Sequence, residues 1–369
     1  MDTHSFDILI IGAGIAGASS AAFASQTHRV ALIEAEEVAG YHSTGRSAGV
    51  WILNYGPPDV QVLTGLSRPF FETPPPGFTE VPLMSQRPVV SLAPPAQLAH
   101  LDEKLAEGQG LEEISIAELR RWVPALNPDY ASRACIERDA FDMDVASLHQ
   151  GFLRQLKSQG GTLALRSRTG RIERHSGLWQ IEVTGGALYH APILINAAGS
   201  WADEVAIQAG RRPIGLQPKR RTGVIVDPAP FTPTDWPLLG DVDHSWYCRP
   251  EARTRLMLSP ADETDMDPQD IQPDELDVAI AIDRVQQALT LDIRRVEHRW
   301  AGLRSFTPDR SLAIGLDQDR DGFFWCAGQG GYGIQTSPAA GRLVADLVCG
   351  RDPGDAAKIL AQIDPRRFA

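Results

Sequence analysis

Residues 7–17 read Asp-Ile-Leu-Ile-Ile-Gly-Ala-Gly-Ile-Ala-Gly, and this stretch decides the fold. Its first half is a continuous apolar run, as expected for a parallel strand that is buried on both faces. Its second half is a glycine turn, and residues 12–26 read as that turn entering a helix. Residues 29–34, Arg-Val-Ala-Leu-Ile-Glu, read as a second strand. This order of strand, turn, helix and strand predicts a βαβ unit and therefore an α/β fold.

The glycine turn has the Gly-x-Gly-x-x-Gly spacing of a Rossmann-type dinucleotide fingerprint. Gly12 allows the tight turn, Gly14 lets the backbone approach a pyrophosphate, and Gly17 lets the helix pack closely on the strand. The helix N-terminus offers free N–H groups and partial positive charge to phosphates. Glu34, 22 residues after Gly12, is placed to accept the ribose hydroxyls and would repel a 2′-phosphate. The fingerprint therefore predicts NAD or FAD and excludes NADP; a glycine turn without a ligand is the alternative.

Residues 41–49, Tyr-His-Ser-Thr-Gly-Arg-Ser-Ala-Gly, follow directly after the second strand. Their small residues permit a close backbone approach, and their hydroxyl groups and arginine suit an extended diphosphate and ribityl chain. This composition favours FAD over NAD, while a polar surface loop is the alternative interpretation.

Composition limits the classes of partner. The 369 residues include 35 basic and 47 acidic side chains, so the formal net charge is −12, and 43% of the residues are hydrophobic. This is ordinary globular usage, and the length suggests two domains. The negative charge argues against nucleic acid or an anionic membrane surface as the partner.

Cysteine spacing and the N-terminal sequence indicate the compartment. The four cysteines form no Cys-x-x-Cys pair, so we predict neither a metal site nor a disulfide framework. The N-terminus lacks the order of a signal peptide, and no apolar stretch reaches the roughly 20 residues of a membrane span. We expect a cytoplasmic protein with no membrane span.

The rest of the chain alternates helical and strand-like segments. Prolines at 57–58, 74–76 and 94–95 predict loops and edge strands, in a different layer from the opening unit. Helices are expected at 98–108, 115–122, 145–158, 275–289 and 338–349. Strands are expected at 162–165, 171–174, 178–183 and 187–190, as a meander, and at 193–199, 223–226, 245–249, 255–259 and 323–328.

Four further strings carry a family resemblance: residues 40–48, 216–221, 300–306 and 329–337. With the fingerprint, they make nearly the whole chain similar to the D-amino acid oxidase-like family of FAD enzymes, which includes glycine oxidase, sarcosine oxidase and D-amino acid dehydrogenases. Within that family the chain most resembles the bacterial D-arginine dehydrogenases.

The resemblance implies an α/β fold in which a Rossmann-type FAD-binding domain is joined to a second, sheet-based substrate domain. The fingerprint and the glycine-rich string at 329–337 lie at opposite ends of the chain yet must meet one cofactor. We therefore expect a discontinuous FAD-binding domain, residues 1–50, 145–215 and 300–369, and a substrate domain, residues 51–144 and 216–299. FAD is expected to bind non-covalently, so Cys326 is not expected to anchor it. The residues expected at the cofactor are Gly12, Gly14, Ala16, Gly17, Glu34, Ala35, Ser43, Thr44, Gly45, Arg46, Ser47, Ala48, Thr169, Gly330, Gly331, Tyr332, Gly333, Ile334 and Gln335.

The resemblance also implies the residues that meet the substrate. Arg304 is expected to bind the α-carboxylate, because a guanidinium fits a carboxylate with two parallel hydrogen bonds. Tyr247 and Tyr55 match positions that close over the carboxylate or the amine. Arg221 matches a substrate-side position, although one of three adjacent cations is often solvated. His42, in the cofactor loop, is not expected to be a catalytic base.

Three apolar residues are expected to line the side-chain pocket: Val50, Ile52 and Val89. Because Val50 and Val89 replace polar residues of the arginine-preferring relatives, they favour an aliphatic or aromatic substrate side chain over D-arginine. Glu80 is the nearest acid in the sequence that could compensate. The acidic residues 262–268 read as a solvated connection.

The implied reaction oxidises a D-amino acid to its imino acid, by hydride transfer from Cα to the flavin, and water then yields a 2-oxo acid and ammonia. The electron acceptor could be a quinone, an electron carrier or O2. A secondary amine oxidase of the sarcosine or proline type is the main alternative. A 2-hydroxy acid dehydrogenase is less favoured, because no well-placed histidine base is evident, and a redox-silent FAD-binding module is the alternative from a different class.

Overall fold

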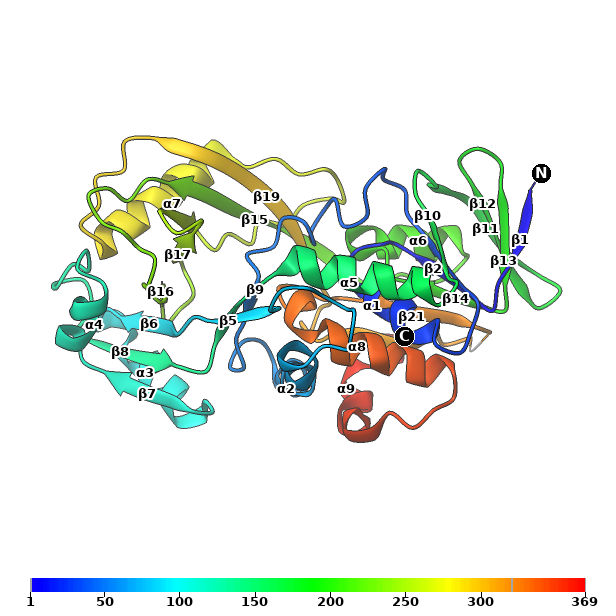
Figure 1. The fold of residues 1–369 in the computed structure, drawn as a ribbon, viewed down its shortest axis with the longest axis horizontal. Helices are drawn as coiled ribbons and strands as arrows, with labels where there is room; N and C mark the ends of the chain where they lie inside the picture. The colour runs from blue at the N-terminus through cyan, green and yellow to red at the C-terminus, as the bar shows by residue number, and fades with distance from the viewer. Residues whose placement is uncertain (1, 320, 369) are drawn as a thin grey trace.

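A six-stranded sheet forms the centre of one half of the molecule in this computed structural model, which describes residues 2–319 and 321–368 (Figure 1). Its five parallel strands are joined by one antiparallel strand at the edge, β20. In spatial order the strands are β10 (Thr162–Ala164), β3 (Val30–Ile33), β2 (Ile8–Ile11), β14 (Ile193–Asn196), β21 (Phe323–Ala327) and β20 (Ala313–Leu316).

Both faces of this sheet are covered, which explains its continuous apolar strands. Ile8 and Ile10 of β2 point into one core, whereas Leu9 and Ile11 point into another, since side chains alternate along a strand. The first core is closed by helices that pack on one another: α1 (Ile15–Ala24), α2 (Pro58–Glu72), α5 (Val145–Ser158) and α8 (Gly333–Val348). The second core is closed by α6 (Ala202–Gln208) and by a second sheet.

The second sheet is the predicted meander, with one difference. The segment at 162–165 is not part of it, because β10 pairs in parallel with β3 in the central sheet. Its place is taken by the N-terminal strand, which pairs in parallel with β13. The sheet order is β1 (Thr3–Ser5), β13 (Leu188–Ala191), β12 (Leu178–Val183) and β11 (Thr169–His175).

An eight-stranded, mostly antiparallel sheet forms the other half (Figure 1). Its separate core includes side chains of α4 (Ile116–Trp122) and α7 (Glu275–Ala288), while α3 (Leu98–Glu107) packs against β7 and β8. The strand order is β19 (Val296–Phe306), β15 (Gln217–Val226), β18 (Arg255–Ser259), β17 (Tyr247–Glu251), β16 (Leu238–Asp241), β6 (Val89–Ala93), β8 (Arg133–Glu137) and β7 (Leu111–Ile114). A small sheet, β4 (Val50–Trp51), β9 (Phe141–Met143) and β5 (Met84–Gln86), lies between the halves.

Helix α2 occupies a segment where loops and edge strands were predicted. Its N-cap is Pro57 and its first residue is Pro58, which needs no N–H partner in the first turn. Val60, Leu63 and Phe71 recur with helical spacing, so they lie on one side of the helix. This side is buried against α8 and the central core. The proline-rich composition concealed this helical spacing, and residues 58–72 pack with the six-stranded half.

Helix α8 begins at Gly333, five residues before the predicted start at Pro338. Pro338 cannot donate to the Ile334 carbonyl, but the Ser337 hydroxyl donates to that oxygen at 2.9 Å. The glycine-rich turn at 330–333 therefore leads directly into the helix N-terminus. The short helix α9 (Leu360–Ile363) follows near the end of the chain.

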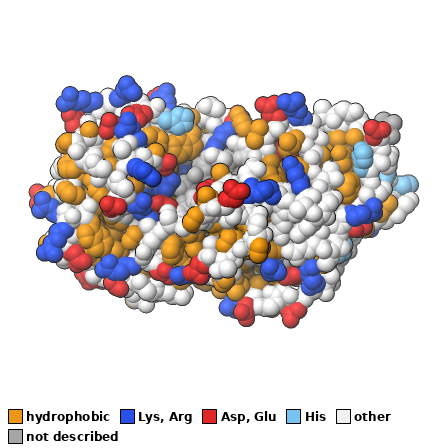
Figure 2. All heavy atoms as spheres, in the orientation of Figure 1, with side chains coloured by type: hydrophobic (Ala, Val, Ile, Leu, Met, Phe, Trp, Pro, Cys, Tyr) orange, Lys and Arg blue, Asp and Glu red, His pale blue; other side chains and the backbone are white. Residues whose placement is uncertain are grey.

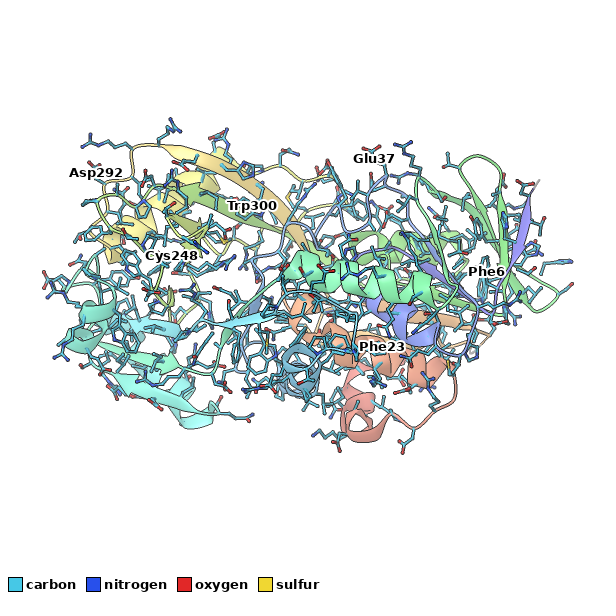
Figure 3. The ribbon with its side chains drawn as sticks, in the orientation of Figure 1. Phe6, Phe23, Glu37, Cys248, Asp292 and Trp300 are labelled. Atoms are coloured by element: carbon cyan, nitrogen blue, oxygen red, sulfur yellow. The ribbon has the colours of Figure 1, made fainter. Side chains whose placement is uncertain are left out.

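Strand β19 joins the two halves, so the predicted domain boundary at residue 300 falls inside a strand. Figure 3 labels Trp300 on this strand, whose indole N–H donates to the Arg46 carbonyl at 3.0 Å. Acidic and basic side chains are interspersed on the face shown in Figure 2. No helix within the described residues has both the length and the apolarity needed to cross a membrane.

Candidate functional site

The N-terminus of α1 opens into a cleft at the carboxyl ends of β2 and β3. Gly14, the N-cap of α1, has no side chain, and the Ile15 N–H donates to Thr44 Oγ1 at 2.9 Å. Among the described residues, no acceptor is recorded for the N–H groups of Gly14 and Ala16. Such free N–H groups at a helix N-terminus are suited to a phosphate.

Glu34 lies beside this helix end and orders the turn around it. Its carboxylate accepts the N–H of Ala13 at 2.8 Å and that of Glu36 at 2.9 Å. An added Cβ on Gly12 would lie 2.4 Å from the Ala197 carbonyl oxygen, and one on Gly17 would lie 1.8 Å from the Gly12 oxygen. Gly12 and Gly17 therefore serve close packing, and Gly12, Gly14 and Glu34 line the cleft.

The cleft collects most residues predicted for the first part of the cofactor, and its free N–H groups, carboxylate and glycines fit a dinucleotide. Thr169 reaches it from β11, as predicted, whereas Gly17 and Gly45 do not line it. Trp201, in the turn after β14, lines it without having been predicted. The predicted residues along its wall are Gly12, Gly14, Ala16, Glu34, Ala35, Ser43, Thr44, Thr169 and Gly330.

The loop at 41–48 is held against β19. The Ser43 hydroxyl donates to the Leu303 carbonyl at 2.6 Å, and the Arg46 guanidinium binds Asp270 and the carbonyls of Ile271 and Ala301. Arg46 thus uses its donors on protein groups. His42 contacts Glu36 at 3.2 Å, and its ring centroid lies 4.6 Å from that of Trp201 with the two rings tilted by 50°. Both side chains line the cleft and not the substrate cavity described below.

A second cavity continues from the cleft and ends at the N-terminus of α8. It is lined by Arg46, Ser47, Ala48, Gly331, Gly333 and Ile334, among others. Gly330 has φ +47°, and an added Cβ there would lie 2.4 Å from the Phe306 ring, so only glycine fits. Among the described residues, the N–H groups of Gly331, Gly333 and Ile334 have no recorded acceptor. This helix end therefore presents donors and positive potential to whatever occupies the cavity.

Arg304 lies where this second cavity meets a third and larger one. Its Nη1 donates to the Tyr55 hydroxyl at 3.0 Å, and no carboxylate forms an ion pair with it among the described residues. Burial alone would lower the pKa of Arg304, but the Tyr55 and Tyr247 hydroxyls beside it hold the pKa above its ordinary value. An enclosed, permanently charged guanidinium without a counter-ion is a binding site for an anion.

Arg221 is the diagonal neighbour of Arg304, on the adjacent strand β15, where it pairs with Gly302. Its Nε donates to the Asp262 carbonyl at 2.9 Å, and its Nη2 lies 3.2 Å from Glu263. Burial, and then the charge of Arg304, lowers the pKa of Arg221. Arg221 is therefore paired and enclosed, and the neighbouring Lys219 and Arg220 also have acidic partners.

The prediction that residues 262–268 form a solvated connection is wrong for the first two residues. The Asp262 carboxylate accepts the N–H and hydroxyl of Thr222, and its side chain is 6% exposed. Glu263 bridges Arg221 and Arg310. Strand β15 carries Thr222 and Arg221, the residues that hold these two acids. The charge pattern of residues 262–268 alone does not reveal these contacts.

The two tyrosines beside Arg304 differ in their electrostatics. Burial alone would raise the pKa of Tyr247, but the charges of Arg304 and Arg221 outweigh it and the pKa lies below its ordinary value. Tyr332, at the start of α8, packs edge-on against Tyr55 with ring centroids 5.3 Å apart, and burial raises its pKa to about 12. Tyr247 is thus the better donor towards an anion.

The third cavity, which we call the substrate cavity, has a volume of about 710 Å³. Arg304, Arg221, Tyr247 and Tyr55 line it, together with the predicted Val50, Ile52, Val89, Tyr332 and Gln335. The exposed Glu80 does not line it, so the acid nearest in sequence is not the one that reaches the cavity.

Several polar residues of the substrate cavity were not predicted. His244, which the sequence analysis did not single out, lines it with its ring centroid 6.1 Å from that of Tyr55. The enclosing protein lowers the pKa of His244 to about 4 by desolvation, although the side chain remains accessible from the cavity. The others are Asn54, Ser91, Lys104, Cys135, Glu137, Asp241, Asp243, Glu263 and Arg310. Glu137 and Cys135 lie on β8, a strand for which no sequence pattern was recognised.

Cys326 lies in β21 with its sulfur 3.8 Å from Ser20 Oγ and 3.6 Å from Gln329 Nε2. The residue is 1% exposed, and burial raises its pKa to about 11. A thiol in this state is a poor nucleophile at neutral pH.

Comparison with known proteins identifies a family and a shared fold. A family model described as FAD dependent oxidoreductase (DAO) matches residues 7–347. Glycine oxidase from Geobacillus kaustophilus superimposes with a TM-score of 0.85 at 22% identity, covering 98% of each chain. L-Proline dehydrogenase from P. horikoshii superimposes with a TM-score of 0.84 at 20% identity, covering 100% of this chain and 98% of that one.

A curated relative, FAD-dependent oxidoreductase domain-containing protein 1 of Xenopus laevis, is 29% identical over 48% of this chain and 38% of its own length. The chain thus matches only about two fifths of that relative. These comparisons support the family and the fold, and the place of the chain among the D-arginine dehydrogenases stays a prediction.

Proposed function

Since the chain belongs to the DAO family of FAD-dependent oxidoreductases, we propose that it oxidises the CH–NH2 bond of a D-amino acid to an imino acid, which water hydrolyses to a 2-oxo acid and ammonia. The observation that carries this proposal is Arg304, an enclosed guanidinium that has no carboxylate partner within the described residues and lies at the junction of the second cavity and the substrate cavity. A substrate carboxylate would complete it.

The cofactor residues have separate roles in this proposal. The α1 N-terminus, Thr44 and Glu34 would hold the adenosine diphosphate part of FAD, and residues 46–48 and 330–334 would hold the flavin part. When bound, FAD supplies a two-electron acceptor. We also propose that the six-stranded half, with α2, is the FAD-binding domain and that the eight-stranded half is the substrate domain.

The substrate residues act by orientation. Arg304 would bind the carboxylate with two parallel hydrogen bonds, and Tyr247 and Tyr55 would donate to it or to the amine. Arg221, already paired with Glu263, adds positive potential without presenting an unpaired charge. Fixing the carboxylate and amine in this way selects the face of Cα that meets the flavin and supplies much of the rate by positioning.

The direct test is anaerobic mixing of the holoenzyme with D- and L-amino acids while flavin absorbance is followed. Bleaching by at least one D-amino acid, with slower bleaching by its enantiomer, is the expected result. N-Methyl amino acids and proline belong in the same panel, because faster bleaching by them would indicate a secondary amine oxidase. Repeating the assay with O2, a quinone and an artificial dye identifies the acceptor.

His244 supports a second candidate, oxidation of a 2-hydroxy acid, which needs a base for the hydroxyl proton. Its pKa of about 4 keeps the imidazole neutral, and therefore able to accept a proton, at neutral pH. That same low pKa makes it a weak base, so we place this reaction second. D- and L-lactate and malate test it, and bleaching by these with none by amino acids would replace the first proposal.

A further inference from the structure

His149, a buried residue of α5, reaches the dinucleotide turn although it lines neither the cleft nor the two cavities. Its Nε2 lies 2.9 Å from the carbonyl oxygen of Ala13, 136 residues away along the chain, and the residue is 4% exposed. Because a carbonyl oxygen only accepts hydrogen bonds, the ring carries a proton on Nε2 and donates it. Burial lowers the pKa of His149, so the ring is neutral at neutral pH. A neutral imidazole thus donates to the backbone of the fingerprint.

This hydrogen bond fixes the peptide unit that presents Gly14 to the cleft. The Ala13 carbonyl and the Gly14 N–H belong to one trans peptide, so they point in opposite directions. His149 holds the carbonyl, whereas Gly14 lines the cleft and its N–H has no recorded acceptor among the described residues. A donor at the carbonyl also polarises the peptide and strengthens its N–H. The Gly14 N–H is therefore held in one direction and is a better donor to an anion.

The preceding peptide unit is held by a different side chain. The Ala13 N–H donates to the Glu34 carboxylate at 2.8 Å, so Glu34 and His149 hold the peptides on the two sides of Ala13. The first backbone hydrogen bond of α1 runs from the Ala18 N–H to the Gly14 carbonyl. Within residues 2–319 and 321–368, no backbone N–H is recorded as a donor to the Ala13 oxygen. Loss of the imidazole would leave that buried carbonyl without its recorded partner.

His149 also packs against the loop that carries Thr44. Gly40, at the start of this loop, has φ +78°, and an added Cβ there would lie 2.9 Å from His149 Cε1 and 3.4 Å from Thr44 Cγ2. Thr44 Oγ1 in turn accepts the Ile15 N–H at 2.9 Å. The imidazole therefore contacts both the dinucleotide turn and the loop, two segments that line the same cleft.

We propose that His149 is a positioning residue for the cofactor, which orients the Ala13–Gly14 peptide so that the Gly14 N–H meets the pyrophosphate of FAD. This inference rests on the proposed placement of the adenosine diphosphate part of FAD at the α1 N-terminus. The fingerprint alone does not reveal this role, because His149 lies on a helix distant in sequence, next to the apolar Leu148 of its buried side.

The test compares FAD binding by the apoenzyme of the wild type, His149→Leu and His149→Gln. Leucine is apolar and has no donor, whereas the glutamine side-chain amide can donate to the Ala13 carbonyl. Quenching of flavin fluorescence during titration gives Kd. We expect Kd to rise about tenfold or more in His149→Leu, because a buried carbonyl loses its partner, and to stay within about threefold of the wild type in His149→Gln.

ADP is the second probe, because it carries the diphosphate without the flavin. Its Kd, measured by competition with FAD, should rise in His149→Leu by the same factor as the Kd of FAD. A loss confined to FAD would place the effect at the flavin and overturn the inference. Failure of ADP to compete in the wild type would instead refute the placement of FAD, and the inference with it.

Phe152→Leu is the matched control for stability. Phe152 lies on the next turn of α5, is 0% exposed in the same core, and lines none of the cavities. This variant should lower the unfolding midpoint and leave the Kd of FAD within about twofold, since packing is lost without a hydrogen bond. An unaltered Kd in His149→Leu, or an equal rise in Phe152→Leu, would overturn the inference while the placement of FAD stands.

A measurement on the wild type decides if His149→Leu does not fold. Nitrogen NMR of the histidine-labelled holoenzyme reports which ring nitrogen carries the proton. A neutral His149 ring protonated on Nε2 is the expected result. Protonation on Nδ1 alone would mean that the ring does not donate to Ala13, and the inference would fail.

Discussion

The cofactor cleft and the substrate cavity recognise their ligands with different parts of the chain. In the cleft, the recognition groups are mostly backbone N–H groups at the starts of α1 and α8, ordered by Glu34 and Thr44. In the cavity they are side chains from several strands, and Arg304 has no carboxylate partner among the described residues. Recognition by backbone N–H groups depends little on side-chain identity and suits a cofactor that stays the same. Recognition by side chains can be altered by substitution to suit a different substrate.

The largest effect should come from a change in the backbone site. Gly12→Ala puts a Cβ 2.4 Å from the Ala197 oxygen at φ +100°, so the turn must move away from the cleft. We expect the purified protein to retain less than about a tenth of the wild-type FAD, because both a clash and backbone strain oppose the turn. The ratio of flavin to protein absorbance measures it.

Gly177→Ala is the control for backbone strain alone. Its φ is +83°, but no atom lies within 4 Å of an added Cβ. FAD content should remain near that of the wild type. Equal loss of FAD in the two variants would mean that the close approach at Gly12 is not what builds the cleft.

Removal of the unpaired cation should spare FAD and impair turnover. Arg304→Ala should lower kcat/KM by about 30- to 1000-fold, or roughly 2–4 kcal/mol, through loss of a charge-assisted contact with two hydrogen bonds. Arg304→Lys keeps the charge without the planar guanidinium, so its kcat/KM should lie between those of the wild type and Arg304→Ala. Steady-state kinetics with the best amino acid, at equal FAD content, decides; near wild-type efficiency in Arg304→Ala would refute the assignment.

The buried carboxylate of Glu137 should cost stability at neutral pH. Burial holds the pKa of Glu137 above its unfolded value, so the folded state binds the proton more tightly, and this group's contribution to stability falls as pH rises through that interval. Glu137→Gln should therefore be more resistant to urea than the wild type at pH 8. The difference should vanish below about pH 4, the ordinary range of a glutamate carboxyl.

Unfolding midpoints at pH 8, 6 and 4 measure this prediction, with Glu80→Gln as the reference. A Glu137→Gln variant that is less stable at pH 8 would show that the carboxylate is fully compensated in the folded protein.

The smallest effect is expected at Cys326, a buried residue of the central-sheet strand β21. Cys326→Ser should leave FAD content and turnover within about twofold of the wild type, since the buried thiol lines none of the three cavities described above and burial raises its pKa to about 11. Acid precipitation should release all flavin from the wild type. Flavin that stays with the precipitate and is lost in Cys326→Ser would show a covalent link.

The fold of the cofactor half was readable from the sequence because its signals are local. The apolar run, glycine turn and helix at 7–24 follow one another directly, and the helix at Val145–Ser158 has the predicted bounds. Helix α2 was missed because its prolines lie at positions that a helix tolerates. The strand β8 was missed because nothing in its five residues marks it as paired on both sides.

The sequence by itself determined the FAD family, the dinucleotide turn and the arginine at 304, since each is written in a contiguous string. Only the tertiary structure decided which charges pair. Asp262 and Glu263 turn inward to meet Thr222 and Arg221, while Glu137 reaches the cavity beside Val89. Pairing across strands depends on register between segments tens of residues apart, so the register decides which charges find partners.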